Sequence, residues 1–262
     1  MEKRESRSDW NPGLYLKFGD ERTQPSVDLV SRIKAINPRN IIDVGCGPGN
    51  STMVLANRWP EAEIYGLDSS RAMIEKARLD YPEKIWLQGD ILDFVPEQKY
   101  GIVFSNAVLQ WIPDHEKLVS GLFDMVDAGG ALAVQISLFS SMTMGKIIED
   151  VSSSGVWQKL MEGCSGLFTY NSSSFYYNLL AEKAGTIEMW ETSYIHVMDS
   201  HQALLDWIRS TGLKPYLDRL PADEMKRKFE QEILEDIKKR YRAEANGKVL
   251  FPFLRLFFIA YK

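Results

Sequence analysis

Short apolar runs alternate with amphipathic segments over the first half of the chain. The runs at 40–44, 63–68, 84–90 and 100–106 have the length and apolar content of buried strands. Helical spacing of apolar residues appears between them, at 25–36, 51–58 and 70–79, and again after Asp114, a residue suited to cap a helix. Strands that alternate with helices predict a parallel sheet covered by helices on both faces.

The second half of the chain departs from this alternation. A strand at 131–136 follows Gly129 and Gly130, and the pattern then loosens over 138–174, which we interpret as an insertion. A helix at 175–184, a strand at 186–198 and helices between 199 and 247 precede a last strand at 249–261. We expect that last strand to pair with 186–198.

The predicted fold class is therefore α/β: a doubly wound, Rossmann-like sheet, mostly parallel, with a carboxyl-terminal antiparallel strand and helical lid insertions. We expect a single domain whose core comprises about 25–137, 175–198 and 249–262. The insertion at about 138–174 and a helical lid at about 199–247 complete it.

Composition narrows the classes of partner. The chain has 262 residues, a net charge of -5 and a pI near 5.4, which disfavours nucleic-acid binding because phosphates require clustered cations. Its opening residues are charged, and no apolar run is long enough to span a bilayer. We therefore expect a cytoplasmic monomer that binds a small molecule and neither nucleic acid nor membrane.

A glycine-rich turn follows the first strand, in the stretch IIDVGCGPGNS. Gly45, Gly47 and Gly49 leave the backbone bare where a strand passes into a helix, so a nucleotide-like ligand could approach it closely. Their spacing is G-x-G-x-G and not the G-x-G-x-x-G of dinucleotide-binding folds. The spacing favours a different ligand.

Two acids follow at the ends of later strands. Asp68 ends the second strand, where a carboxylate can accept hydrogen bonds from ribose hydroxyls. Asp90 ends the third strand and could accept from an adenine amino group. An acid there is absent from the dinucleotide fingerprint.

These motifs allow a family resemblance to be stated. The chain resembles class I S-adenosylmethionine-dependent methyltransferases in IIDVGCGPGNST, GLDSSRAMIEKAR, GDI and FSNAVLQWIPDHEKL followed by AGGALAVQ. More narrowly it resembles the trans-aconitate methyltransferase family, in DWNPGLYLKFGDERTQPSVDLV, SNAVLQWIPDH and SHQALLDWIRSTGLKPYL. The likeness covers nearly the whole chain and is poor from 137 to about 174.

The resemblance implies S-adenosyl-L-methionine as the cofactor and a set of residues that would bind it. In that reading the turn lines the methionine end, Asp68 holds the ribose, Asp90 and Ile91 bracket the adenine, and the amino-terminal arm closes over the site. The implied residues are Tyr15, Arg22, Asp43, Gly45, Cys46, Gly47, Gly49, Asp68, Ser69, Met73, Asp90, Ile91, Asn106 and Ala107.

The predicted reaction is methyl transfer to a carboxylate of a small organic acid. A carboxylate with a pKa near 4 is already ionised at pH 7, so no general base is needed, and none is evident. Gln110 and Trp111 follow the fourth strand and are candidates for the substrate pocket, although Trp111 could equally be core. Arg255 is the candidate carboxylate anchor, with Arg209 and Lys214 as alternatives.

The insertion leaves the acceptor open between a trans-aconitate-like acid and a more apolar one. No arginine occurs from Ile136 to Ser174, so a family loop that supplies a guanidinium has no counterpart there. Five apolar residues could cover an apolar tail or simply pack onto the core: Phe139, Met142, Met144, Leu167 and Phe168. This absence predicts that trans-aconitate is a poor substrate and that a monocarboxylic or more apolar acid is preferred.

Other reactive residues receive plainer interpretations. Cys46 fits as a small side chain between glycines, His115 as a surface residue, and His196 and His201 have no metal-ligand spacing. No metal is implied. Two alternative functions stay open at this point: a non-catalytic protein that binds S-adenosylmethionine and a nicotinamide-dependent oxidoreductase.

Overall fold

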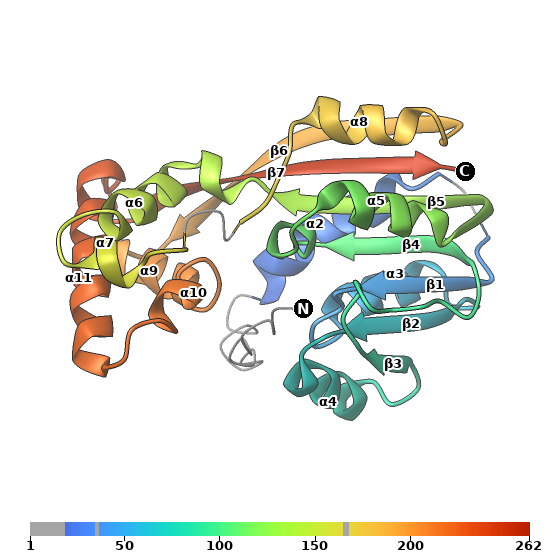
Figure 1. Cartoon of the computed structure of the whole chain (residues 1–262), viewed down its shortest axis with the longest axis horizontal. Helices are drawn as coiled ribbons and strands as arrows, with labels where there is room; N and C mark the ends of the chain where they lie inside the picture. Colours follow the sequence, from blue (N-terminus) through green and yellow to red (C-terminus); the bar gives the residue numbers. More distant parts are fainter. Residues whose placement is uncertain (1–18, 35–36, 165–167) are drawn as a thin grey trace.

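A seven-stranded sheet forms the centre of the computed structural model, which describes residues 19–34, 37–164 and 168–262 (Figure 1). The strand order is β3-β2-β1-β4-β5-β7-β6. The strands are β1 (Asn40–Val44), β2 (Glu63–Asp68), β3 (Ile85–Gln88), β4 (Tyr100–Asn106), β5 (Val126–Ser137), β6 (Thr186–Met198) and β7 (Val249–Tyr261). Neighbours from β3 to β5 pair in parallel, and β7 runs antiparallel between β5 and β6. The expected fold class and the pairing of the last strand are confirmed.

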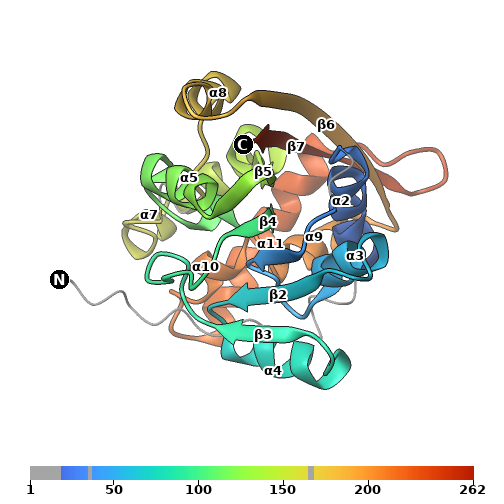
Figure 2. The same cartoon turned by 90° about the vertical axis from the view of Figure 1, so that its right-hand side faces the viewer.

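Helices cover both faces of this sheet (Figure 2). Helices α2 (Gly19–Arg32) and α3 (Asn50–Arg58) pack on one face, while α5 (His115–Asp124) and α8 (Ser173–Ala181) pack on the other. Strand β4 shows why: Ile102 and Phe104 join the α2 side, and Val103 between them joins the α5 side. Helix α4 (Arg71–Asp80) packs against β3 through Trp86.

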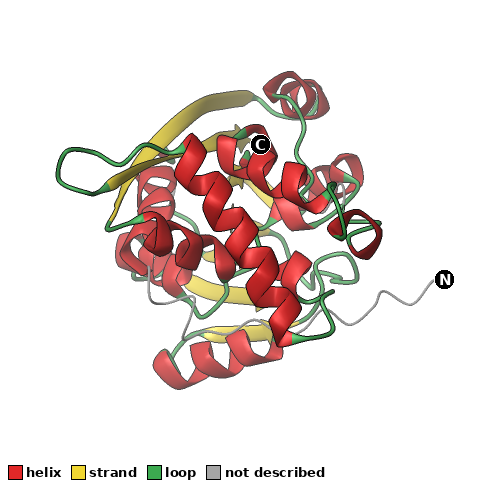
Figure 3. Ribbon diagram, turned by 90° about the vertical axis from the view of Figure 1, so that its left-hand side faces the viewer, coloured by secondary structure: helices red, strands yellow, loops and turns green. Residues whose placement is uncertain are grey.

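A helical layer lies beyond the carboxyl ends of the parallel strands, around the long ends of β6 and β7 (Figures 1 and 3). It consists of α6 (Thr143–Ser152), α7 (Trp157–Leu160), α9 (His201–Arg209), α10 (Lys214–Leu217) and α11 (Asp223–Arg240). One apolar cluster joins Ile147 of α6, Leu204 of α9 and Phe229 of α11 to Phe251 of β7. The segments that the sequence divides into an insertion and a lid therefore share one core.

Two elements begin at least five residues before their predicted start. Helix α2 begins at Gly19, six residues earlier than expected, and contains Pro25 in its interior, which removes one backbone donor without ending the helix. Strand β5 begins at Val126, before the glycine pair that the sequence predicts to precede it. The register of β4 against β5 shifts between Tyr100 and Ile102, and this irregularity accommodates the glycines within the strand.

None of the described helices combines the length and the apolar character that crossing a membrane would require.

Candidate functional site

The glycine turn connects β1 to α3 at the point where the sheet reverses its winding direction, between β1 and β4. Gly45, Gly47 and Gly49 have φ angles of 74°, 55° and 100°, which L side chains rarely adopt. A Cβ at Gly45 would lie 2.2 Å from Val108, and one at Gly49 would lie 2.8 Å from Trp86. A Cβ at Gly47 would meet no atom of the described residues within 4 Å, so among them Gly47 faces the open side of the turn.

The carboxylate of Asp68 holds this turn from the end of β2. Its Oδ2 accepts a hydrogen bond from the Gly47 N–H at 2.9 Å, and its Oδ1 accepts one from the Ser70 N–H at 2.8 Å. An ionised carboxylate has acceptor capacity for more than two such bonds. Asp68 can therefore order the turn and accept from a ligand hydroxyl as well.

Asp43 lies fully buried beneath the turn. Its Oδ2 accepts from the hydroxyls of Ser51 and Thr52 at 2.6 and 2.7 Å, and its Oδ1 is buried without a partner among the described residues. Burial raises the pKa of the Asp43 carboxyl to about 6, against the two hydroxyl hydrogen bonds, which lower it. A cation placed near this carboxylate would relieve an unfavourable buried charge.

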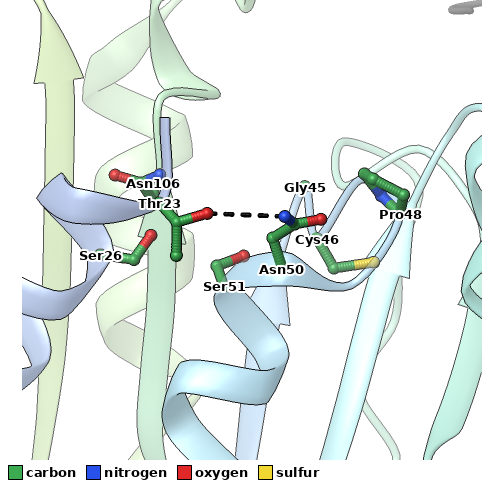
Figure 4. A pocket seen from close by; sticks show the side chains of 8 residues that line it. All are labelled: Thr23, Ser26, Gly45, Cys46, Pro48, Asn50, Ser51 and Asn106. Carbon is green, nitrogen blue, oxygen red and sulfur yellow. Dashed lines mark hydrogen bonds between the residues drawn. The ribbon is translucent and has the colours of Figure 1, made fainter. Parts of the chain in front are cut away.

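A pocket opens between the turn, the first part of α2 and the end of β4 (Figure 4). The Ser26 hydroxyl and the Asn106 Oδ1 are buried in the structure without hydrogen-bond partners among the described residues. Buried polar atoms of this kind are unusual unless a ligand or water satisfies them. The lining residues are Thr23, Ser26, Gly45, Cys46, Pro48, Asn50, Ser51 and Asn106.

The backbone after β4 is strained. Ala107 has a φ of 58°, which is rare for a residue with a Cβ, and its N–H donates to the Gln135 carbonyl at 3.0 Å. The Gln110 Nε2 donates to the Ala107 carbonyl at 2.7 Å and closes the bend. The two hydrogen bonds hold this bend, which places Val108 in the space that Gly45 leaves.

The two substrate candidates Gln110 and Trp111 lie on η1 (Leu109–Trp111), directly after this bend. Gln110 is buried, and the Trp111 ring lies 4.6 Å from that of Phe168. Phe168 is in turn 5.0 Å from Phe139, between ring centroids. Trp111 is thus part of an aromatic group that joins the carboxyl end of the parallel strands to the helical layer, and its place in a substrate pocket stays a prediction.

The candidates for the nucleoside end lie at the carboxyl ends of β2 and β3. Asp90 is half-buried, and its Oδ1 accepts from the Leu92 N–H at 3.0 Å. Ile91 is also half-buried, Ser69 is exposed, and Met73 is buried in α4. The structure brings these four residues to the same edge as Asp68.

The two candidates on the amino-terminal arm are not characterised by the structure. Tyr15 lies outside the described residues. Arg22 belongs to α2 by its backbone, but its side chain lies outside what the structure describes.

The three candidate anchors occupy different surroundings. Arg209 donates to Glu230 of α11 at 2.6 Å, and Lys214 donates to Asp218 one turn further along at 2.7 Å. Both cations thus serve the helical layer. Arg255 is 4% exposed on β7 and donates from Nη1 to the Gln135 Oε1 at 3.1 Å. Gln135, on β5, is paired in register with the pocket residue Asn106 of β4.

The interpretation of His115 as a surface residue is wrong. The ring is buried between the Tyr176 hydroxyl, 2.5 Å from Nδ1, and the Leu109 carbonyl, 2.8 Å from Nε2. Burial lowers the pKa of His115, so it acts as a neutral link between η1 and α8. Sequence periodicity misses it because a polar residue after a capping Asp looks solvated.

The remaining reactive groups are unremarkable. Cys46 is buried, and desolvation raises the pKa of its thiol well above the ordinary value, which suits a packing role. Across the described ranges, no three His, Cys, Asp or Glu side chains gather in a way that could hold a metal ion.

Sequence reasoning also missed the polar residues that support the site. Ser51 and Thr52 bind Asp43, and Gln135 binds Arg255. A polar residue inside the apolar run ALAVQI was the available signal for Gln135.

Comparisons with known proteins agree with this geometry. Residues 42–134 match the family described as Methyltransferase domain. The chain is similar to trans-aconitate 2-methyltransferase of Enterobacter sp. (strain 638), with 38% identity over 254 residues that cover 97% of this chain and 98% of the relative.

Solved structures share the fold at low identity. The YcgJ protein of Bacillus subtilis has a TM-score of 0.60 and 14% identity, covering 91% of this chain and 98% of that one. Phosphoethanolamine N-methyltransferase 2 of Haemonchus contortus, in complex with S-adenosylhomocysteine, has a TM-score of 0.56 and 16% identity, covering 91% and 52%.

Proposed function

Because the chain belongs to the trans-aconitate methyltransferase family of class I S-adenosylmethionine-dependent methyltransferases, we propose that it methylates a carboxylate of a small polycarboxylic acid. Trans-aconitate is the first candidate, which replaces the preference for a more apolar acid that the arginine-free segment 136–174 predicts. The full-length similarity to trans-aconitate 2-methyltransferase carries this proposal. The oxidoreductase alternative has no such support, and the glycine spacing already disfavours it.

The residues around the glycine turn fit the proposed cofactor. The open side of Gly47 admits a ligand against the backbone, and the Asp68 carboxylate can accept from ribose hydroxyls. The negative charge of Asp43 and the orphaned oxygen of Asn106 suit the ammonium group of a methionine moiety. Asp90 and Ile91 would hold the adenine, and the cofactor would supply an activated methyl on its sulfonium.

The protein's part in the reaction is to orient the acceptor and to exclude water. A carboxylate is ionised at pH 7 and attacks without a general base, so alignment of its oxygen with the methyl carbon is the main requirement. Trp111, Phe139 and Phe168 provide an apolar wall that would shield the reacting atoms. We propose that the helical layer formed by α6, α7, α9, α10 and α11 acts as the lid over this site.

The aromatic wall also favours a second candidate acceptor. Trp111, Phe168, Phe139 and Phe253 form a continuous ring series that could cover the tail of a more apolar monocarboxylic acid. The two candidates differ in charge and can be compared directly.

Product analysis by mass spectrometry tests the proposal. The purified chain is offered S-adenosylmethionine with trans-aconitate, other tricarboxylic acids, and fatty and aromatic monocarboxylic acids. We expect a monomethyl ester of one acid class, formed equally with and without a chelator, because a carboxylate needs no Lewis acid. Tight binding of S-adenosylhomocysteine with no ester from any acid would favour the non-catalytic alternative.

A further inference from the structure

A row of polar side chains crosses three neighbouring strands on the face that α2 covers. Asn106 of β4 is paired in register with Gln135 of β5, and Ser137 of β5 is paired with Arg255 of β7. Gln135, Ser137 and Arg255 are each at most 5% exposed. Alternation along the strands places these residues on one face, beside the pocket of the glycine turn.

Arg255 is fixed in orientation by its contacts. Its guanidinium lies 4.4 Å from the Phe253 ring centroid and 5.7 Å from that of Tyr194, and Nη1 donates to the Gln135 Oε1. The two ring contacts and the hydrogen bond together fix the orientation of the planar guanidinium. The bond also orients the Gln135 amide, so its Nε2 points away from Arg255's Nη1.

Two donors beside Arg255 have no acceptor among the described residues. They are the Gln135 Nε2 and the Ser137 hydroxyl, both buried. An unsatisfied buried donor destabilises a protein, so such atoms mark places where a ligand or water belongs. Two amide or hydroxyl donors next to a guanidinium form a site that is complementary to an anion with several acceptor oxygens.

We propose that Gln135, Ser137 and Arg255 form a subsite for a carboxylate, and that it binds a non-reacting carboxylate of the methyl acceptor. This inference rests on the proposed function. A carboxylate is planar, accepts several hydrogen bonds and pairs well with a guanidinium. The subsite supplies the cation that the arginine-free segment 136–174 lacks, and it favours di- and tricarboxylic acids over the apolar alternative.

The carboxylate of the cofactor's methionine moiety has the same chemistry. The pocket that holds Asn106 adjoins the subsite, so affinity for the acceptor has to be measured separately from affinity for the cofactor. S-adenosylhomocysteine carries the same carboxylate as the cofactor, so its affinity reports binding of the cofactor carboxylate.

The test uses Arg255→Met, which keeps the aliphatic stem and removes the charge, and Ser137→Ala, which removes one donor. Arg242→Met, at an exposed arginine, is the matched control. Trans-aconitate and the monocarboxylic acid crotonate are compared as acceptors. Calorimetry then gives the Kd of trans-aconitate with S-adenosylhomocysteine bound, and that of S-adenosylhomocysteine alone.

We expect Arg255→Met to raise the KM and the Kd of trans-aconitate by roughly ten- to a hundredfold, and Ser137→Ala to raise them by roughly three- to tenfold. The Kd of S-adenosylhomocysteine and the KM of crotonate should change by less than about twofold, which is near the reproducibility expected when no charged contact is lost. Arg242→Met should leave all four values unaltered.

Three results would overturn the subsite. One is an equal loss of S-adenosylhomocysteine affinity in Arg255→Met, which would assign the carboxylate to the cofactor. Another is an equal loss for crotonate and trans-aconitate. The third is unchanged trans-aconitate binding in Ser137→Ala. This substitution removes only one hydroxyl, so it remains informative if Arg255→Met does not fold. If the unaltered chain instead methylates no acid, the proposed function itself fails.

Discussion

At the scale of single residues, Asp43 and His196 show how burial sets charge around the site. Asp43 is an ionisable acid buried away from water, with one oxygen lacking a partner among the described residues, and burial raises the pKa of its carboxyl to about 6. His196 is a base in an apolar setting, and the pKa of its imidazole is lowered to about 4, by burial and then by the charge of Arg255. Both shifts make stability depend on pH, in opposite directions.

Asp43→Asn is expected to stabilise the ligand-free protein and to weaken cofactor binding. The amide keeps an oxygen for Ser51 and Thr52, while the buried charge disappears. The folded carboxyl has a raised pKa, so its ionisation destabilises the fold as pH rises through about 6, by up to about 3 kcal/mol above that pH.

The gain in the free energy of unfolding should therefore be largest at pH 7–8 and shrink below about pH 6. Denaturant unfolding at pH 8 and below about pH 6 measures this gain in stability, and calorimetry with S-adenosylhomocysteine measures the weakened cofactor binding. Equal or lower stability of the variant at pH 8 would show that the Asp43 charge is compensated in the ligand-free state.

His196 should make the protein less stable in mild acid. The unfolded chain takes up a proton near pH 6.5, whereas the folded His196 does so only near 4, so stability falls between those values, by about 3 kcal/mol in total. Below about pH 4 both states are protonated and this contribution changes no further. A two-dimensional NMR titration reads the folded pKa.

Arg255→Met should raise the pKa of His196 partway toward 6.5, since the loss of one positive charge favours the imidazolium while burial remains. A His196 that titrates near 6.5 in the unaltered protein would mean that its ring is hydrated.

At the scale of elements, the turn between β1 and α3 combines two separate requirements for glycine. All three glycines need a positive φ, yet only Gly47 faces open space; Gly45 and Gly49 are pressed by the protein's own side chains. The positive φ is a requirement of the backbone, whereas the close contacts at Gly45 and Gly49 are a requirement of packing. Of the three positions, Gly47 is the one left for a ligand. Asp68 ties the turn to β2 and so makes two elements into one site.

Gly47→Ala and Gly45→Ala should separate these roles. We expect Gly47→Ala to cost about 1 kcal/mol of stability through its φ alone, yet to abolish measurable binding of S-adenosylhomocysteine. Gly45→Ala should cost more than about 2 kcal/mol, because its Cβ would also overlap Val108. Thermal unfolding and calorimetry give the two quantities, and Gly45→Ala combined with Val108→Ala should regain part of the lost stability. Normal binding by Gly47→Ala would remove this turn from the cofactor site.

At the scale of the whole molecule, the sheet and the helical layer meet where the site lies. Strands β6 and β7 belong to the sheet at one end and to the core of α6, α9 and α11 at the other. Arg255 sits near the middle of β7, between these two parts. The layer is therefore held to the sheet by two continuous strands, which suits a cover that shifts slightly without separating.

Closure of this layer predicts a pattern of hydrogen exchange. With S-adenosylhomocysteine and trans-aconitate bound, α9, α10 and the segment 139–152 should exchange more slowly, because an excluded site requires the cover to spend less time open. Helix α8 packs on the face of the sheet opposite to α2, outside the helical layer, so its exchange should not change and serves as the internal control. Unchanged exchange in the layer, with binding verified by calorimetry, would argue against a lid.

Much of this protein could be read from local sequence. Alternation of strands and helices fixes the parallel sheet, because buried strands and amphipathic helices have different hydrophobic periods. The glycines at 45, 47 and 49 were recognisable, since few residues tolerate such backbone angles. Asp68 and Asp90 could be predicted as site residues because each ends a predicted strand, and the carboxyl ends of parallel strands lie along the same edge of the sheet.

Tertiary structure decided what depends on packing between distant segments. Only the fold unites 138–164 with 199–247 in one core, buries His115 against Tyr176, and orients Arg255 through Gln135, 120 residues away in sequence. In the sequence, each of these features was indicated only by individual polar or apolar residues. Such residues also occur singly on solvated surfaces, so they do not predict burial or a distant partner. Periodicity reports which face of an element is buried, but it does not report what that face meets; the charge of Asp43 and the direction of Arg255 are set by those neighbours.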